Sequence, residues 1–193
     1  RRLLIPTLLG TLSMSAMTAI DGIIVGQGVG AVGVAAVNIV VPIYQIMSGL
    51  ALMIGAGCSV VASIHLAQRK LKVARMNIAQ ALVAATAIAS LICLTIIISP
   101  ERTAVLLGAS STLLPHVLDY MIWLMPGFIF EMFGIIGLFI IRLDGAPRYA
   151  MWCNIIPAVL NAILDWVFVF PMDMGVKGAG VATSMCMVLG GVM

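Results

Sequence analysis

The sequence predicts an all-α integral membrane protein built as a six-helix transmembrane bundle. Its 193 residues are 63% hydrophobic and only 9% charged, with a mean hydropathy of +1.21. A soluble domain is about one quarter charged, because its surface faces water. The segments from Gly22 to Gln68 and from Met76 to Pro100 contain no Asp, Glu, Lys or Arg, and about 20 apolar residues cross a bilayer as a helix. These observations exclude soluble enzymes, nucleic-acid-binding proteins and secreted scaffolds.

Charges, prolines and glycines divide the chain into six expected helices. The first apolar stretch ends at the glycine-rich turn Gly26–Gly30, the second before the basic cluster at Arg69, and the third at Ser99-Pro100. The start Arg1-Arg2 resembles that of a signal peptide, but the residues that follow the first stretch are equally apolar. We therefore interpret the first stretch as a span.

The remaining three helices follow a polar segment that ends at Pro115. The fourth ends before Arg142, the fifth ends at Pro171, and the sixth begins after Lys177. We expect a single domain over residues 1–193, with helices at about 3–26, 31–66, 73–98, 116–141, 149–170 and 178–193.

The second expected helix is long for one span, and a break near Ser48-Gly49 would make it two short helices. The basic residues favour one helix, because six spans then place most of them on one side, which the positive-inside rule assigns to the cytoplasm. That side carries Arg1, Arg2, Arg69, Lys70, Lys72, Arg75, Arg142 and Arg148, and the other carries Arg102 and Lys177. We therefore expect a cytoplasmic amino terminus and a second helix that protrudes from the membrane.

Polar residues on four of the expected helices fall at one depth in the outer third of the membrane. An ionisable residue inside a bilayer costs about 2.5–3.5 kcal/mol, so each one needs a reason. At 1.5 Å per residue, Asp21 and Asp165 both lie roughly 8 Å below the outer boundary. Asn161 precedes Asp165 by one helical turn and shares its face. Asn38 and Thr183 lie at a similar depth.

The chemistry of this layer is that of a cation site. Carboxylate, amide and hydroxyl oxygens are hard ligands that suit protons or Na⁺. Two close carboxylates in a low dielectric resist double ionisation, so they hold a proton or recruit a cation. The alternative is that Asp21 caps the outer turn and Asp165 makes a local hydrogen bond.

No other metal site is expected, and the four cysteines indicate buried, inert thiols. They lie far apart in apolar runs and form no CxxC pair: Cys58, Cys93, Cys153 and Cys186. The segment Gly28–Gly33 fits the GxGxxG pattern, but it follows a span and lacks an acidic residue about 20 positions later, so no nucleotide cofactor is expected. The four-residue spacing of Gly22, Gly26 and Gly30 instead indicates close helix packing.

Glu131 lies apart from this layer, near the middle of the fourth expected helix. A charge that faces lipid at that depth is unfavourable. Two interpretations are open: Glu131 lines a cavity for cationic substrates, or it pairs with a part of the protein outside this chain. Asp119, near the outer end of the same helix, is expected to be a solvated rim residue.

Three separate motifs resemble those of the multidrug and toxic compound extrusion (MATE) transporters. The first reads Asp21-Gly-Ile-Ile-Val-Gly26 and continues to Asn38. The second reads Arg142-Leu-Asp-Gly-Ala-Pro-Arg-Tyr-Ala-Met151. The third reads Asn161-Ala-Ile-Leu-Asp165, followed by Gly175-Val-Lys-Gly-Ala-Gly-Val-Ala-Thr183. The resemblance covers essentially the whole chain.

The resemblance implies that this chain is the amino-terminal lobe of a twelve-helix transporter whose carboxy-terminal lobe lies outside it. It implies a secondary active exporter of a bacterial inner membrane, not an enzyme, that exchanges amphipathic cationic drugs for H⁺ or Na⁺ by alternating access. It places the cation site at Asp21, Asn161, Asp165 and Thr183, and a helix-bending role at Pro6. The implied partners are the drugs, the bilayer and the second lobe, with no cofactor and no nucleic acid.

Two other functions compete with drug export. A lipid-linked oligosaccharide flippase of the same superfamily would present an arginine-rich cavity, whereas the expected spans contain no mid-membrane Lys or Arg. An intramembrane aspartyl protease also uses two membrane aspartates, but its YD and GxGD motifs differ from Ile-Asp21-Gly and Leu-Asp165-Trp. The sequence therefore favours export and leaves both coupling ions open.

Overall fold

Every regular element of the described chain is an α-helix. The computed structural model describes the backbone of residues 4–193 and the side chains of residues 8, 12 and 15–193. The described residues form α1 (Leu4–Gly28), α2 (Ala31–Ala67), α3 (Leu71–Ile98), α4 (Pro100–Leu106), α5 (Leu114–Leu143), α6 (Pro147–Val169) and α7 (Gly175–Val192). The predicted all-α fold class is confirmed.

Five of the described helices are long and apolar enough to cross a membrane, namely α2, α3, α5, α6 and α7. The first helix, α1, has 25 residues. At 1.5 Å per residue it is about 37 Å long, which exceeds the roughly 30 Å of a bilayer core. Pro6 lies in α1, but its side chain is outside the described residues, so its helix-bending role stays a prediction. Arg1 and Arg2 also lie outside the described residues.

The helix boundaries differ from the expected ones at two connections. The segment after Ser99, for which only a polar connection and no helix was expected, contains α4, which begins at Pro100 and carries Glu101 in its first turn. Proline at the first helical position and an acid near the positive end of the helix both favour a helix start. The last helix, α7, begins at Gly175, earlier than expected. In contrast, α2 runs without a break through Ser48.

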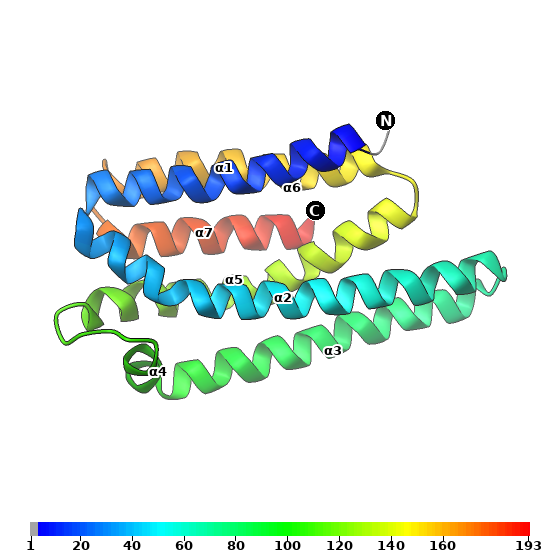
Figure 1. Cartoon of the computed structure of the whole chain (residues 1–193), viewed down its shortest axis with the longest axis horizontal. Helices are drawn as coiled ribbons and strands as arrows, with labels where there is room; N and C mark the ends of the chain where they lie inside the picture. The colour runs from blue at the N-terminus through cyan, green and yellow to red at the C-terminus, as the bar shows by residue number, and fades with distance from the viewer. Residues whose placement is uncertain (1–3) are drawn as a thin grey trace.

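The helices form two groups that meet mainly through α5 and α7. In one group α1 packs on α6 and α6 on α7, while in the other α3 packs on α2 and α5. Figure 1 shows these groups as an upper and a lower row, with the α2–α3 hairpin extending past the other helices at one end. The chain turns sharply between α1 and α2 at Gly30, whose φ of 82° favours glycine. The helices joined there therefore belong to different groups.

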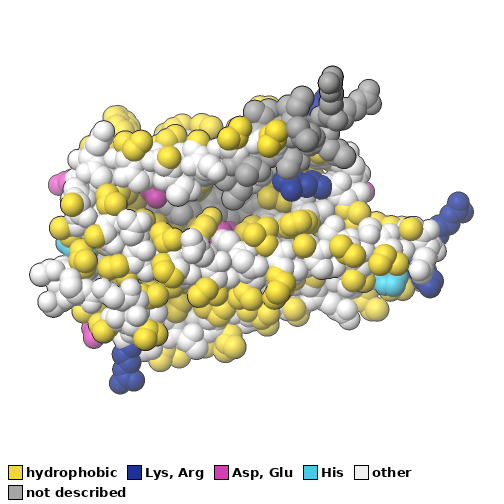
Figure 2. Space-filling view, viewed as in Figure 1, with side chains coloured by type: hydrophobic (Ala, Val, Ile, Leu, Met, Phe, Trp, Pro, Cys, Tyr) yellow, Lys and Arg dark blue, Asp and Glu magenta, His cyan; other side chains and the backbone are white. Residues whose placement is uncertain are grey.

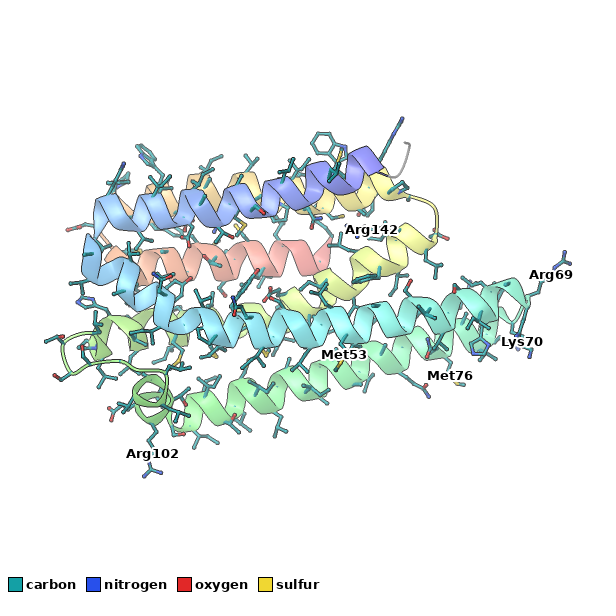
Figure 3. The ribbon with its side chains drawn as sticks, viewed as in Figure 1. Met53, Arg69, Lys70, Met76, Arg102 and Arg142 are labelled. Atoms are coloured by element: carbon teal, nitrogen blue, oxygen red, sulfur yellow. The ribbon has the colours of Figure 1, made fainter. Side chains whose placement is uncertain are left out.

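Basic side chains are separated between the two ends of the bundle. Figure 3 shows Arg69 and Lys70 at the tip of the α2–α3 hairpin, and Arg102 at the opposite end of the molecule. Arg142 lies in the last turn of α5, toward the end that carries the hairpin tip (Figure 3). This is the separation that the positive-inside rule associates with a cytoplasmic and an external side.

Close packing of helices occurs between α5 and α7, where small residues line the contact. A Cβ atom added to Gly127 would lie 2.9 Å from the Cα of Ser184, and one added to Gly180 would lie 3.0 Å from the carbonyl oxygen of Tyr120. Such distances leave no room for a side chain. The α5–α7 contact therefore fixes how the two groups of helices are joined.

Of the predicted packing stripe at Gly22, Gly26 and Gly30, only Gly26 meets a neighbouring helix, because a Cβ added there would lie 3.4 Å from a side-chain carbon of Val34 on α2. Cβ atoms at Gly22 and Gly30 would meet no described atom within 4 Å. The face of α1 that meets α6 carries Gly28 instead, where an added Cβ would overlap the side chain of Val169. The four-residue spacing identifies a small-residue face but not the side of the helix on which the neighbour packs.

Gly127→Val is expected to lower the free energy of unfolding by about 1–3 kcal/mol, because the added side chain overpacks the α5–α7 contact. The measurement is the melting temperature of the purified full-length protein in detergent. Gly137→Val on the same helix is the matched control, since a Cβ there meets no described atom within 4 Å. Equal melting temperatures for the two variants would show that the α5–α7 contact tolerates a larger residue.

The interior of the bundle is centred on α5. Among its fully buried side chains are Met121, Leu124, Met125, Phe128, Met132 and Ile136. The four cysteines are buried and free, as predicted. Apolar packing therefore holds α5 in place, and this helix carries two polar residues that line a cavity, Tyr120 and Glu131.

Candidate cation-binding site

A cavity of about 210 Å³ lies between the two groups of helices. Residues of α1, α2, α5, α6 and α7 form its wall. Most of them are apolar, and the polar ones are Thr18, Asp21, Tyr44, Tyr120, Glu131, Asn154 and Thr183. In the part of the chain that the structure describes, no Lys or Arg lines this cavity. Figure 2 shows the surface hollowed between the two rows of helices, with acidic side chains beside the hollow.

Asp165 on α6 is the most deeply buried acid of the described chain. Its side chain is 0% exposed. Both carboxylate oxygens are buried and find no hydrogen-bond partner among the described residues. Burial of a charge without a partner is costly, and a bound proton or cation would remove that cost.

Asp21 on α1 faces Asp165 across the α1–α6 contact. The two carboxyl groups lie close enough to interact electrostatically, because α1 packs along α6. Asp21 is half-buried, lines the cavity, and its Oδ1 atom also lacks a hydrogen-bond partner within the described residues. Two acids in this arrangement resist simultaneous ionisation, so the pair suits one shared proton or a bound cation.

Asn161 and Thr183 complete the oxygen-rich group. The Asn161 Nδ2 atom donates a hydrogen bond to the Thr183 Oγ1 atom at 3.4 Å, which joins α6 to α7. Asn161 is 0% exposed, and its Oδ1 atom has no hydrogen-bond partner in the described part of the chain. The structure thus brings together Asp21, Asn161, Asp165 and Thr183 from three helices, with several oxygens available to a cation.

Tyr120 on α5 belongs to this group, and the sequence reasoning missed it. It lies close enough to Asp21, Asp165 and Thr183 to interact with each of them, and it lines the cavity. Its hydroxyl can donate a hydrogen bond to a carboxylate. Its neighbour in the chain, Asp119, lies near the outer end of the same helix. That neighbouring acid is exposed, as expected of a rim residue.

Asn38 does not join the group. Its side chain is exposed, whereas Val37, Val40 and Val41 of the same helix line the cavity. Depth along a helix gives the height of a residue, but successive residues point about 100° apart at 3.6 residues per turn. The structure therefore gives no support to Asn38 as a ligand in the predicted cation site.

Glu131 lines the same cavity at a different level. The Ser48 Oγ atom donates a hydrogen bond to its Oε1 atom at 2.9 Å. At 1.5 Å per residue, Glu131 lies about 16 Å along α5 from Tyr120. The cavity thus contains two acidic positions, one at the Asp21–Asp165 pair and one at Glu131.

A family model described as MatE matches residues 6–167 of the chain. The chain belongs to the MatE family. The resemblance seen in the three sequence motifs is thereby confirmed, and it extends from α1 through most of α6. Asp21, Asn161 and Asp165 of the candidate site lie inside the matched range, while Thr183 lies beyond it.

Solved MATE structures superpose closely on this MatE chain. The MATE multidrug transporter DinF-BH, solved as a complex, is 34% identical, with a TM-score of 0.88 over 97% of this chain and 42% of that chain. A MATE in complex with MaD3S is 26% identical, with a TM-score of 0.91 over 99% of this chain and 43% of that chain.

A protein named FAD transporter from Shewanella oneidensis is 28% identical to this MatE chain over 185 residues, which is 93% of this chain and 40% of that protein. The chain therefore spans less than half the length of each of these relatives. The cavity and its acids belong to that shared portion.

Proposed function

We propose that this chain is the amino-terminal lobe of a secondary active exporter that antiports amphipathic cationic drugs against H⁺ or Na⁺. The observation that carries the proposal is the Asp21–Asp165 pair beside an apolar cavity, in which both oxygens of the buried Asp165 and the Oδ1 atom of Asp21 lack hydrogen-bond partners among the described residues. Membership of the MatE family supports transport over enzymatic activity. The apolar helices and the basic hairpin tip support a multi-pass protein of a bacterial inner membrane, with its amino terminus in the cytoplasm.

The proposed coupling acts through the contact between α1 and α6. A proton or Na⁺ at the acid pair offsets one of the two negative charges, which removes the repulsion between the facing carboxyl groups and holds α1 against α6. Loss of that cation leaves negative charge in a buried position, which favours an arrangement that admits water. Exchange with a drug requires that the cation and the drug prefer different arrangements, because a ligand shifts an equilibrium only by its differential affinity.

The chemistry of the cavity supports cationic substrates. Its described lining contains two acidic residues, Asp21 and Glu131, and no Lys or Arg. The volume of about 210 Å³ is below the roughly 300–1,000 Å³ of sites for drug-sized molecules. A second lobe would supply the remaining wall, in agreement with the length of the solved relatives.

FAD is a second candidate substrate, because one relative carries the name FAD transporter. The pyrophosphate of FAD is anionic, and proteins bind such groups with Arg, Lys and backbone N–H groups. The described cavity lining contains no Lys or Arg, and its charged residues are the acids Asp21 and Glu131. FAD transport would therefore need its cationic contacts outside this chain.

The test is ethidium efflux from proteoliposomes that carry the full-length protein, under an imposed H⁺ or Na⁺ gradient. We expect efflux under one of the two gradients, and its loss when an ionophore dissipates that gradient. A parallel arm measures FAD efflux. Transport of FAD without ethidium would replace the proposed substrate class, and absence of both from folded protein would favour the lipid-linked oligosaccharide flippase.

A further inference from the structure

Only one of the two carboxylate oxygens of Glu131 accepts a hydrogen bond from the described residues. Its Oε1 atom accepts the hydrogen bond from Ser48, while Oε2 is buried and has no hydrogen-bond partner among the described residues. Ser48 follows Tyr44 by one turn of α2, so both face α5 from the same side. The Tyr44 hydroxyl lies close to the same carboxylate. Packing of α2 on α5 therefore holds an oriented acid with one oxygen available.

The surroundings of Glu131 match a cationic group. Tyr44 lines the cavity, and its ring packs on Phe128 at a centroid distance of 6.2 Å and an interplanar angle of 49°. An aromatic ring beside a carboxylate attracts an amine or a planar cation through both charge and cation–π contact. The described residues that line the cavity include no Lys, Arg or His that would already neutralise Glu131.

The Glu131 position is separate from the Asp21–Asp165 pair, although one cavity reaches both. Tyr120 lies close enough to the acid pair to interact with it electrostatically, and Glu131 lies about 16 Å further along α5. Apolar side chains line the wall between the two levels, among them Val40, Val41 and Leu124. An amphipathic cation can therefore place its charge at one level and its apolar body along the wall while the other level holds a small ion.

We propose that Glu131, oriented by Ser48 and flanked by Tyr44, binds the cationic group of the transported compound at a site distinct from the coupling-ion site. The proposal rests on the export function proposed above and names the residue that recognises the substrate charge. In this proposal the Glu131 level of the cavity binds the transported compound, and the level of the acid pair binds the coupling ion. Glu131 is thus a substrate-binding residue, and Asp21 and Asp165 serve the coupling ion.

The test is equilibrium binding of ethidium, followed by fluorescence, to the purified full-length protein without any gradient. Glu131→Gln keeps the size of the side chain and an acceptor for Ser48 but removes the charge. We expect it to weaken ethidium binding about tenfold or more, as for loss of a charge-assisted contact. Binding of N-phenyl-1-naphthylamine, an uncharged aromatic probe, should stay unchanged. Asp119→Asn, which neutralises an exposed acid on the same helix, is the matched control.

Three results would overturn the proposal. These are equal ethidium affinity in the wild-type protein and Glu131→Gln, equal weakening for the charged and the uncharged probe, and absence of ethidium binding to the wild-type protein. A lower melting temperature of Glu131→Gln would indicate that Glu131 instead pairs with another part of the protein. The proposal predicts an unchanged or higher melting temperature, because an unpartnered buried oxygen stabilises nothing.

The binding assay separates this proposal from the export function. Because no gradient is present, selective loss of ethidium affinity in Glu131→Gln supports the site even if gradient-driven efflux fails. Efflux that is coupled to an ion, combined with unchanged affinity in Glu131→Gln, leaves the export function standing and overturns the Glu131 site alone.

Discussion

Asp165→Asn is expected to reduce ion-driven ethidium efflux to the rate of protein-free liposomes, while the protein remains at least as stable as the wild type. An amide neither releases a proton nor supplies a negative charge, so the pair loses one of its two charges and Asp21 alone no longer exchanges the coupling cation. The same substitution removes a buried carboxylate whose two oxygens lack partners among the described residues, and with it a desolvation cost. The measurements are efflux in proteoliposomes and the melting temperature in detergent.

The combination of the two readouts distinguishes a functional acid from a structural one. Wild-type efflux in Asp165→Asn would show that this carboxyl is not part of the coupling site. A large drop in melting temperature together with lost efflux would show that Asp165 supports the fold instead. Asp119→Asn is the control, because that acid is exposed and lies outside the group of facing oxygens.

Asp21→Asn is expected to reduce coupled efflux as strongly as Asp165→Asn, and the double variant is expected to reduce it no further. The two carboxyl groups interact directly, and residues that act as one unit show strongly non-additive effects. Efflux is measured for the wild type, each single variant and the double variant under the same gradient. Residual efflux in each single variant, with a multiplied loss in the double variant, would mean that the acids act independently.

The sequence predicted the fold class and the height of the acid pair for physical reasons that need no tertiary information. Composition alone requires a membrane environment, and a constant rise of 1.5 Å per residue places Asp21 and Asp165 at one level once the turns are located. The helical period then places Asn161 on the face of Asp165. Thr183 was predicted to belong to the cation site mainly because of the resemblance to MATE transporters.

The directions in which side chains point were not accessible from the sequence. The helix that carries Asn38 is apolar on all sides, so its pattern does not reveal which face meets the cavity. Its exposed side chain shows that the predicted depth of a residue along a helix does not determine whether it faces the cavity. Tyr120 was missed for the complementary reason, since an aromatic residue in an apolar helix gives no charge signal although its hydroxyl reaches the acids.

The structure also adds a distinction that the sequence left open at Glu131. Its position on the fourth expected helix left two interpretations open, a place in a cavity for cationic substrates and a pairing with a part of the protein outside this chain. The hydrogen bond from Ser48 and the shared cavity place Glu131 with Tyr44, away from the acid pair. Such a partnership depends on how α2 packs on α5, which no local sequence pattern encodes.

The central claim is that the Asp21–Asp165 pair binds the coupling cation in competition with the drug. The most direct measurement is the release of that cation when ethidium is added to the purified full-length protein, with a pH indicator for H⁺ and displacement of radioactive sodium for Na⁺. Linkage requires that a drug which favours the other arrangement expels the cation. We predict release of one of the two ions by the wild-type protein and no release by Asp165→Asn. Equal release by the wild-type protein and Asp165→Asn would contradict the claim.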